Sequence, residues 1–224
     1  METRQLLLEN RQFMYAFFAR AFAEEPDGDF FATVLGSHLA QEVALVEDEY
    51  SAALAEGLEE ARRLLRDGGG WAPGASLASL GEEYVRVFVG PGSLPARPWE
   101  TMHRTGKNTL FQPGVLEVRA AYRRSGFLPQ RYPHVSDDFI GLEFDFMARL
   151  AALAFDAASE GDATEERARE EASLDFLQHH LLKWMSGFAD GMQEHYGDCF
   201  YGAIASMAAA YLQRDRAVLE ELLG

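Results

Sequence analysis

The chain has 224 residues, 48% of them hydrophobic, which is enough to bury one sizeable core without cross-links. Its 36 acidic and 20 basic residues give a formal net charge of −16, so the surface repels nucleic-acid phosphate and anionic membranes and attracts basic ligands. A single cysteine, Cys199, excludes an internal disulfide framework and any multi-cysteine metal site. This composition is typical of a globular protein in a reducing compartment, and we expect a cytoplasmic location.

Helical periodicity begins at the N-terminus, where apolar residues recur at three- and four-residue steps as far as residue 22. Charged residues interrupt this stretch, which therefore lacks the unbroken apolar core of a signal peptide. No segment approaches the ~18–20 uncharged apolar residues of a membrane span. The PDGD sequence at 26–29 ends the first helix, and we expect further helices near 29–36, 40–66 and 77–88.

The segment VFVGPGSLPARPWETMH, residues 87–103, has no usable periodicity, and we expect a long Pro-rich loop from about 89 to 112. A loop rich in proline loses little entropy on binding, because its backbone is already restricted. Trp99 beside Pro98 offers a flat apolar contact, Met102 an adaptable one, and Glu100 an anion. Two interpretations stay open: a binding edge for a peptide that is basic and then apolar, and a crossover that Trp99 anchors to the helices.

Helical patterns continue after this segment, over residues 113–126, 135–155 and 173–192 and in one or two closing helices. The helix at 135–155 is apolar on two faces, which indicates a central position in a bundle. No strand pattern of useful length, internal repeat or shift in composition divides the chain. We therefore predict an all-α fold, a single helical bundle domain over residues 1–224 with about nine to eleven helices.

Motifs of common enzyme classes are absent: the sequence has no GxSxG, Walker loop, HExxH or strand-linked GxGxxG, so we predict no catalytic residues. The adjacent His179 and His180 point about 100° apart on a helix and cannot chelate one ion alone. His134 with Asp137 and Asp138 offers further ligand types. We predict no metal site, and we keep as the alternative function a small helical metal-dependent enzyme or regulator that uses these five residues.

Three segments together carry a family resemblance. They are EEYVRVFVGPGSLPARPWETMH at 82–103, DDFIGLEFDFMARLA at 137–151 and FLQHHLLKWMSGFADGM at 176–192. In this order and at these separations they resemble the TorD/DmsD-type redox-enzyme maturation chaperones, relatives of the NarJ proteins. The resemblance spans most of the chain, although no single motif is specific.

The resemblance implies an all-helical, non-enzymatic protein that binds the twin-arginine signal peptide of a molybdenum-cofactor oxidoreductase subunit. Such chaperones hold the apoenzyme for cofactor insertion and proofread its release to the Tat translocon. It further implies no resident cofactor beyond weak guanine-nucleotide binding in some members, and either a monomer or a domain-swapped dimer. Phe139 stands where the family usually has histidine, which weakens the expectation of nucleotide binding here.

By motif position, the resemblance transfers functional roles to Asp138, Glu143 and the Pro98–Trp99–Glu100 loop. Carboxylates form charge-assisted contacts with arginine, and large apolar side chains can receive the apolar part of a signal peptide. Residues 11 and 15 lie on one face of the first helix and are expected to border the same groove, and a core position is an equally open interpretation for Tyr15. The complete candidate signal-peptide-binding set is Arg11, Tyr15, Tyr84, Phe88, Pro98, Trp99, Glu100, Met102, Asp138 and Glu143.

Overall fold

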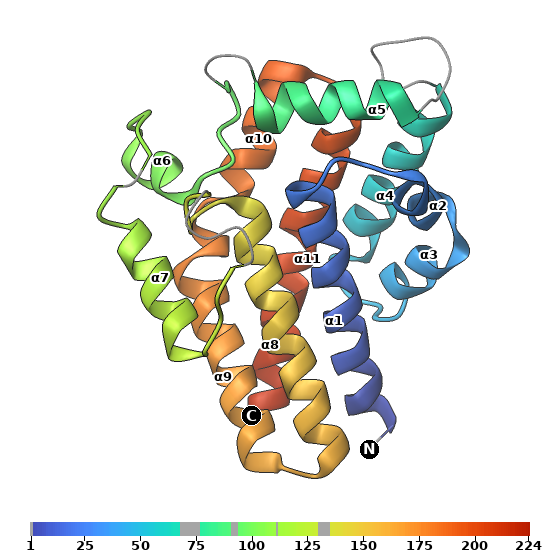
Figure 1. The fold of residues 1–224 in the computed structure, drawn as a ribbon. Coiled ribbons are helices and arrows are strands. Elements are labelled where there is room, and N and C mark those ends of the chain that lie inside the picture. The colour runs from blue at the N-terminus through green and yellow to red at the C-terminus, as the bar shows by residue number, and fades with distance from the viewer. Residues whose placement is uncertain (1, 68–76, 91–93, 111, 130–134) are drawn as a thin grey trace. The chain divides into compact units, whose positions relative to one another are not determined.

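A computed structural model describes residues 2–67, 77–90, 94–110, 112–129 and 135–224, and these residues are predominantly helical (Figure 1). The all-α prediction is confirmed: within those ranges the only strand-like pairing is an isolated bridge between Trp99 and Phe139. None of the described helices is both long and apolar enough to cross a membrane. The elements are α1 (Glu2–Ala23), α2 (Gly28–Leu35), α3 (Ser37–Val43), α4 (Ser51–Asp67), α5 (Leu77–Tyr84), η1 (Val85–Val89), α6 (Glu100–Thr105), α7 (Val115–Arg124), α8 (Ile140–Glu160), α9 (Ala163–His179), η2 (Leu181–Lys183), α10 (Met185–Tyr196) and α11 (Phe200–Leu223).

The described chain forms two compact units. The first contains Met1–Ala19, Trp99–Trp184 and Leu212–Gly224, and the second contains Arg20–Pro98 and Met185–Tyr211. Helices α1 and α11 contribute a part to each unit. The expectation of a single domain over residues 1–224 stays a prediction.

Helices α8 and α9 form an antiparallel pair in the first unit (Figure 1). The polar turn between them ends α8 at Gly161, whose φ of 76° is a left-handed conformation that glycine adopts without strain. Asp162 then caps α9 by accepting hydrogen bonds from the backbone N–H groups of Thr164 and Glu165. The apolar side of this pair includes Phe146 and Phe176, whose ring centroids are 4.8 Å apart.

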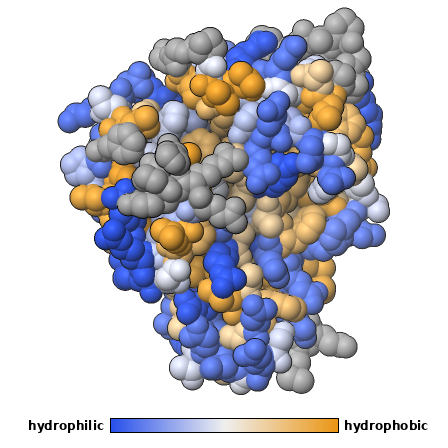
Figure 2. All heavy atoms as spheres, in the orientation of Figure 1, coloured by the Kyte–Doolittle hydropathy of each residue, from blue (hydrophilic) through white to orange (hydrophobic). Residues whose placement is uncertain are grey.

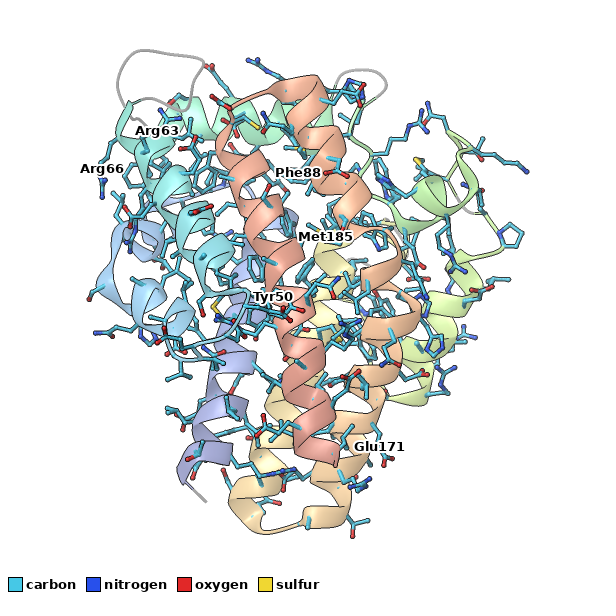
Figure 3. The ribbon with its side chains drawn as sticks, turned by 180° about the vertical axis from the view of Figure 1, so that it is seen from behind. Tyr50, Arg63, Arg66, Phe88, Glu171 and Met185 are labelled. Atoms are coloured by element: carbon cyan, nitrogen blue, oxygen red, sulfur yellow. The ribbon has the colours of Figure 1, made fainter. Side chains whose placement is uncertain are left out.

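An aromatic cluster forms the core of the second unit. Phe22, Tyr84, Phe88, Phe188 and Tyr201 are all buried, and Phe88 has ring contacts with each of the other four. Figure 3 shows Phe88 among the helices, whereas the two labelled arginines of α4 extend outward. Large buried aromatic side chains dominate the energetics of small cores, so this cluster fixes the position of α5 and η1 within the unit.

A short helix interrupts the predicted loop from about 89 to 112, and this corrects the loop prediction. Helix α6 begins at Glu100 and ends at Thr105, and Gly106 closes it with a φ of 69°. A helix of six residues is too short to show periodicity, and its N-cap residue, Trp99, makes no side-chain cap. Residues 91–93 and 111 of the predicted loop lie outside the described residues.

A buried carboxylate marks the start of α11 in the second unit. Glu83, only 2% exposed, accepts a hydrogen bond from the backbone N–H of Tyr201 at 2.8 Å. Burial raises the pKa of Glu83 to about 7, although the N–H groups of Tyr201 and Phe200 and the charge of Arg86 favour its ionised form. Glu83 therefore titrates near neutral pH while it caps the helix.

This pKa makes the stability of the protein depend on pH. The pKa of Glu83 is about 7 in the folded chain and near 4.5 in the unfolded one, so the folded state binds more protons between these values. The free energy of unfolding should therefore fall as pH rises from about 4.5 to 7, by at most about 3 kcal/mol from this group. Glu83→Gln stays neutral and still accepts a hydrogen bond from Tyr201. In this variant the free energy of unfolding, measured by urea unfolding, should therefore differ less between pH 5 and pH 8 than in the wild type. Equal pH slopes for Glu83→Gln, the wild type and the exposed control Glu82→Gln would contradict the assignment.

Candidate functional site

Two distant segments meet at the start of α6, in the first unit. Trp99 forms an isolated antiparallel bridge with Phe139, and the backbone N–H of Glu100 donates to the carbonyl oxygen of Asp138 at 3.0 Å. We call residues 99–101 and 136–139 the crossing. It joins the end of the Pro-rich segment to the residues immediately before α8, 37 positions away along the chain.

The carboxylate of Asp138 holds the crossing together. One oxygen, Oδ2, accepts from the backbone N–H of Thr101 at 3.1 Å and from the Thr101 hydroxyl at 2.5 Å. The other oxygen accepts from the Ser136 hydroxyl at 2.5 Å. Asp138 is only 1% exposed, so these hydrogen bonds replace the water that its charge would otherwise require. Asp138 thus caps α6 from outside its own sequence.

The neighbouring Asp137 attaches α7 to the crossing. Its carboxylate pairs with Arg119 of α7 at 2.5 Å, and its carbonyl oxygen accepts from the Tyr122 hydroxyl at 2.8 Å. Asp137 is 1% exposed, so this ion pair is partly desolvated and geometrically fixed. Adjacent aspartates therefore have different partners, one in α6 and one in α7.

Glu100, the first residue of α6, is completely buried and pairs with two basic side chains. Its Oε2 atom lies 2.9 Å from Nδ1 of His180, and its Oε1 accepts from Nη1 of Arg104 at 2.9 Å. Arg104 also reaches Glu117 of α7 at 3.2 Å. Glu100 is thus an internal link between α6 and the end of α9.

A second buried carboxyl, Glu143 of α8, lies beside Glu100. Burial, and then the negative charge of Glu100, raise the pKa of Glu143 well above its usual range. The Oε2 atom of Glu143 accepts from the indole N–H of Trp184 at 3.1 Å. The raised pKa favours the neutral form of Glu143, which lowers the cost of burying a second carboxyl group beside Glu100.

Partly exposed aromatic rings lie on the crossing and on α6. The ring centroids of Trp99 and Phe139 are 6.0 Å apart and tilted by 51°, and both side chains are partly exposed. The partly exposed His103 lies 5.3 Å from the buried ring of Trp184. Met102 lies below this surface, 5% exposed. Flat rings on a fixed support offer an apolar contact surface that loses little side-chain entropy on binding.

The predicted site residues of α1 lie in another part of the first unit. Arg11 pairs with Asp215 of α11 at 2.6 Å, and the Tyr15 hydroxyl donates to the same carboxylate at 2.6 Å. Both side chains are buried, so they join α1 to α11 rather than border the crossing. The ring of Tyr15 does contact Phe144, which follows Glu143 in α8.

Three other predicted residues belong to the second unit. Tyr84 and Phe88 lie in its aromatic core, 7% exposed each, and Pro98 is buried at the end of the unit. Of the ten predicted residues, only Trp99 has a partly exposed side chain. The structure brings Trp99, Glu100, Met102, Asp138 and Glu143 together, and the prediction that they contact a peptide stays a prediction.

Sequence reasoning missed the partners that hold these residues in place. They are Thr101, Arg104, Arg119, Tyr122, Ser136, His180 and Trp184. The signals were present but weak: Trp184 and His180 occur in the third family-like segment, yet nothing local indicates that their partners are Glu143 and Glu100. Such pairings connect residues 41 and 80 positions apart, so only the fold reveals them.

The alternative metal-dependent function gains no support from the described residues, among which no group of three or more His, Cys, Asp or Glu side chains is placed to hold a metal ion. Asp137 and Asp138 are engaged by Arg119, Thr101 and Ser136, as described above. The two adjacent histidines have different environments, His180 buried against Glu100 and His179 exposed beside Asp175 at 3.0 Å. His134 lies outside the described residues.

Comparison with known proteins defines the family of this all-helical chain. The model of the nitrate reductase delta subunit family matches residues 47–190, more than half of the chain. The chain therefore belongs to this family, which includes the TorD/DmsD-type maturation chaperones, and the resemblance of the three motifs is confirmed.

Curated relatives carry the names of chaperones. The Tat proofreading chaperone DmsD of Salmonella paratyphi A is 28% identical over 141 residues, which cover 63% of this chain and 62% of the relative. The chaperone protein TorD of Vibrio cholerae is 24% identical over 143 residues, 64% of this chain and 63% of the relative. The matches thus span less than two thirds of the length of these relatives. A solved structure from Archaeoglobus fulgidus, described as a redox enzyme maturation protein, aligns over 94% of this chain and 93% of its own with a TM-score of 0.43 and 18% identity.

Replacing Asp138 tests its role in the crossing. Asp138→Ala should lower the free energy of unfolding by about 2 kcal/mol, because it removes a helix cap and leaves buried donors unpaired. Asp138→Asn should cost less, since its amide oxygen can still accept from Thr101 and the Ser136 hydroxyl can rotate to accept its N–H. Urea unfolding followed by tryptophan fluorescence measures both. A loss for Asp138→Ala no larger than that for Asp156→Ala, an exposed position of α8, would refute the capping role.

Proposed function

We propose that the protein is a cytoplasmic, non-enzymatic maturation chaperone for a molybdenum-cofactor oxidoreductase subunit. Its ligand is the twin-arginine signal peptide of that subunit, and by holding the apoprotein it assists cofactor insertion and delays export through the Tat translocon. The chaperone names of the curated relatives support this function. We include no resident cofactor, and Phe139, which stands where the family usually has histidine, weakens the case for nucleotide binding.

The partly exposed ring pair of Trp99 and Phe139 carries this proposal. The two rings form one apolar surface held by the crossing, and a signal peptide presents an apolar stretch directly after its arginines. Large aromatic side chains on rigid supports are the usual energetic centres of binding surfaces. The apolar stretch is proposed to pack on this pair.

The buried carboxylates have a supporting role in the proposal. Asp138, Glu100 and Glu143 are each at most 1% exposed and already engaged with internal partners, so in this conformation they position the rings rather than contact arginine. The arginines of the peptide are attracted instead by the exposed acidic side chains of this chain, whose formal net charge is −16. Such attraction weakens as salt screens it.

The test is calorimetry with a synthetic peptide that carries two consecutive arginines and the apolar stretch of the leader. Trp99→Ala should weaken binding at least about 10-fold, equivalent to ~1.4 kcal/mol, because it removes half of the ring pair. Tyr50→Ala removes another partly exposed aromatic side chain, in the second unit (Figure 3), and should leave the affinity unchanged. Unchanged binding by Trp99→Ala would show that the peptide contacts another surface, and no binding by the wild-type protein would reject the proposed function.

A further inference from the structure

A groove of about 880 Å³ lies on the second unit, away from the aromatic core of that unit. One wall is the turn that joins α1 to α2, with Glu25 and Pro26. The other wall is α5 with η1, including Leu77, Gly81 and Val85. Its volume suits several peptide side chains. On the face seen in Figure 2, hydrophobic atoms gather at the η1 end of this wall and hydrophilic atoms over the α1–α2 turn.

The wall formed by α5 and η1 has apolar residues on its outer side as well as its inner side. Leu77, Val85 and Val89 are 42%, 38% and 63% exposed, and they follow one another at multiples of four positions. Leu80 and Tyr84, on the opposite side, are buried. A surface helix normally turns polar residues to water, so apolar side chains along an open groove indicate a contact surface.

Gly81 forms the floor of the groove, in the middle of α5. Glycine in a helix interior costs about 1 kcal/mol relative to alanine. No left-handed turn requires it here, and the only atom beyond its own helix that lies within 4 Å of an added Cβ is Oε1 of Glu25 at 3.3 Å. This contact is tight but involves the end of a flexible side chain, so the missing Cβ leaves room for the Glu25 carboxylate at the floor of the groove.

Two carboxylates line this groove. Glu25 extends over Gly81 from the turn, and the exposed Glu82 lies on α5. Arg20 stabilises the turn between α1 and α2. It pairs with Glu24 at 2.6 Å and with Asp27 at 2.7 Å, and it donates a hydrogen bond to the carbonyl oxygen of Glu25. The carboxylate of Glu25 reaches Gly81, and the described lining of the groove contains two carboxylates and one guanidinium, that of Arg86.

We propose that this groove is a second contact for the client peptide, with an arginine or lysine between Glu25 and Glu82 and apolar side chains on Leu77 and Val85. The charge and apolarity of the two walls match a segment that is basic on one side and apolar on the other. The proposal rests on the proposed function for the identity of the peptide. The surface that it assigns, the groove beside α5, does not include the ring pair of Trp99 and Phe139.

Charge reversal tests the contact. Glu82→Arg should weaken binding of the twin-arginine peptide at least 10-fold in calorimetry. The same variant should bind a peptide with both arginines replaced by glutamate at least 10-fold better than the wild type does. Glu49→Arg makes the same change of charge at an exposed position before α4, and it should alter either affinity less than 2-fold. This control separates a local contact from the general attraction of an acidic chain.

Filling the floor tests the groove without a change of charge. Gly81→Ala should raise the melting temperature, since alanine favours the helix, while Gly81→Leu should fold but lose peptide affinity at least 10-fold. Should both Gly81→Leu and Glu82→Arg bind like the wild type while Trp99→Ala still weakens binding, the groove proposal fails and the proposed function stands. Failure of the wild-type protein to bind the peptide would overturn both. Concentration-dependent dimerisation that Gly81→Leu abolishes would assign the groove to a second copy of the chain and overturn the peptide contact.

Discussion

The carboxylate of Asp138 is the interaction on which the rest of the candidate site depends. Helix α6 has no side-chain cap of its own, and its first turn is completed by an acid that lies 37 residues away along the chain. Because the same residue accepts the backbone N–H of Glu100 through its carbonyl, it fixes where Trp99 meets Phe139. One buried side chain therefore converts an irregular, Pro-rich segment into a surface of defined shape.

The acidic residues of this protein divide into two groups with different physical roles. Glu100, Asp137, Asp138 and Glu143 are buried, and each has a hydrogen-bond or ion-pair partner within the first unit. They hold α6, α7 and α8 together and are not available to a ligand in this conformation. Further buried acids, among them Glu83 and Asp215, have internal partners as well, and the acids at exposed positions, including the turn between α1 and α2, are those placed to attract a basic ligand from solution. The carboxylates that hold the helices of the site together are thus different from those that attract a basic ligand.

Much of the fold was predictable from the sequence, because long helices with an apolar face, such as α4 and α8, produce a clear 3.6-residue period. Helix α6 was not, since six residues capped from a distant segment leave no local pattern. For the site, motif position led to Trp99, Asp138 and Glu143, which the structure does bring together. The shared helix face of Arg11 and Tyr15 grouped Arg11 with them, but the structure pairs Arg11 with Asp215. The partners His180 and Trp184 depend on contacts across 80 and 41 positions, which periodicity does not encode.

The central claim is that a peptide binds on the surface supported by the crossing, and amide hydrogen exchange tests it most directly. Exchange of the intact protein would be measured with and without a saturating twin-arginine peptide. Our account predicts slower exchange at residues 99–103 and 139–142 and along α5, with little change in α2, α3 and the α8–α9 turn. Slower exchange in α2, α3 or the α8–α9 turn alone, with unchanged exchange in the crossing and α5, would contradict this account.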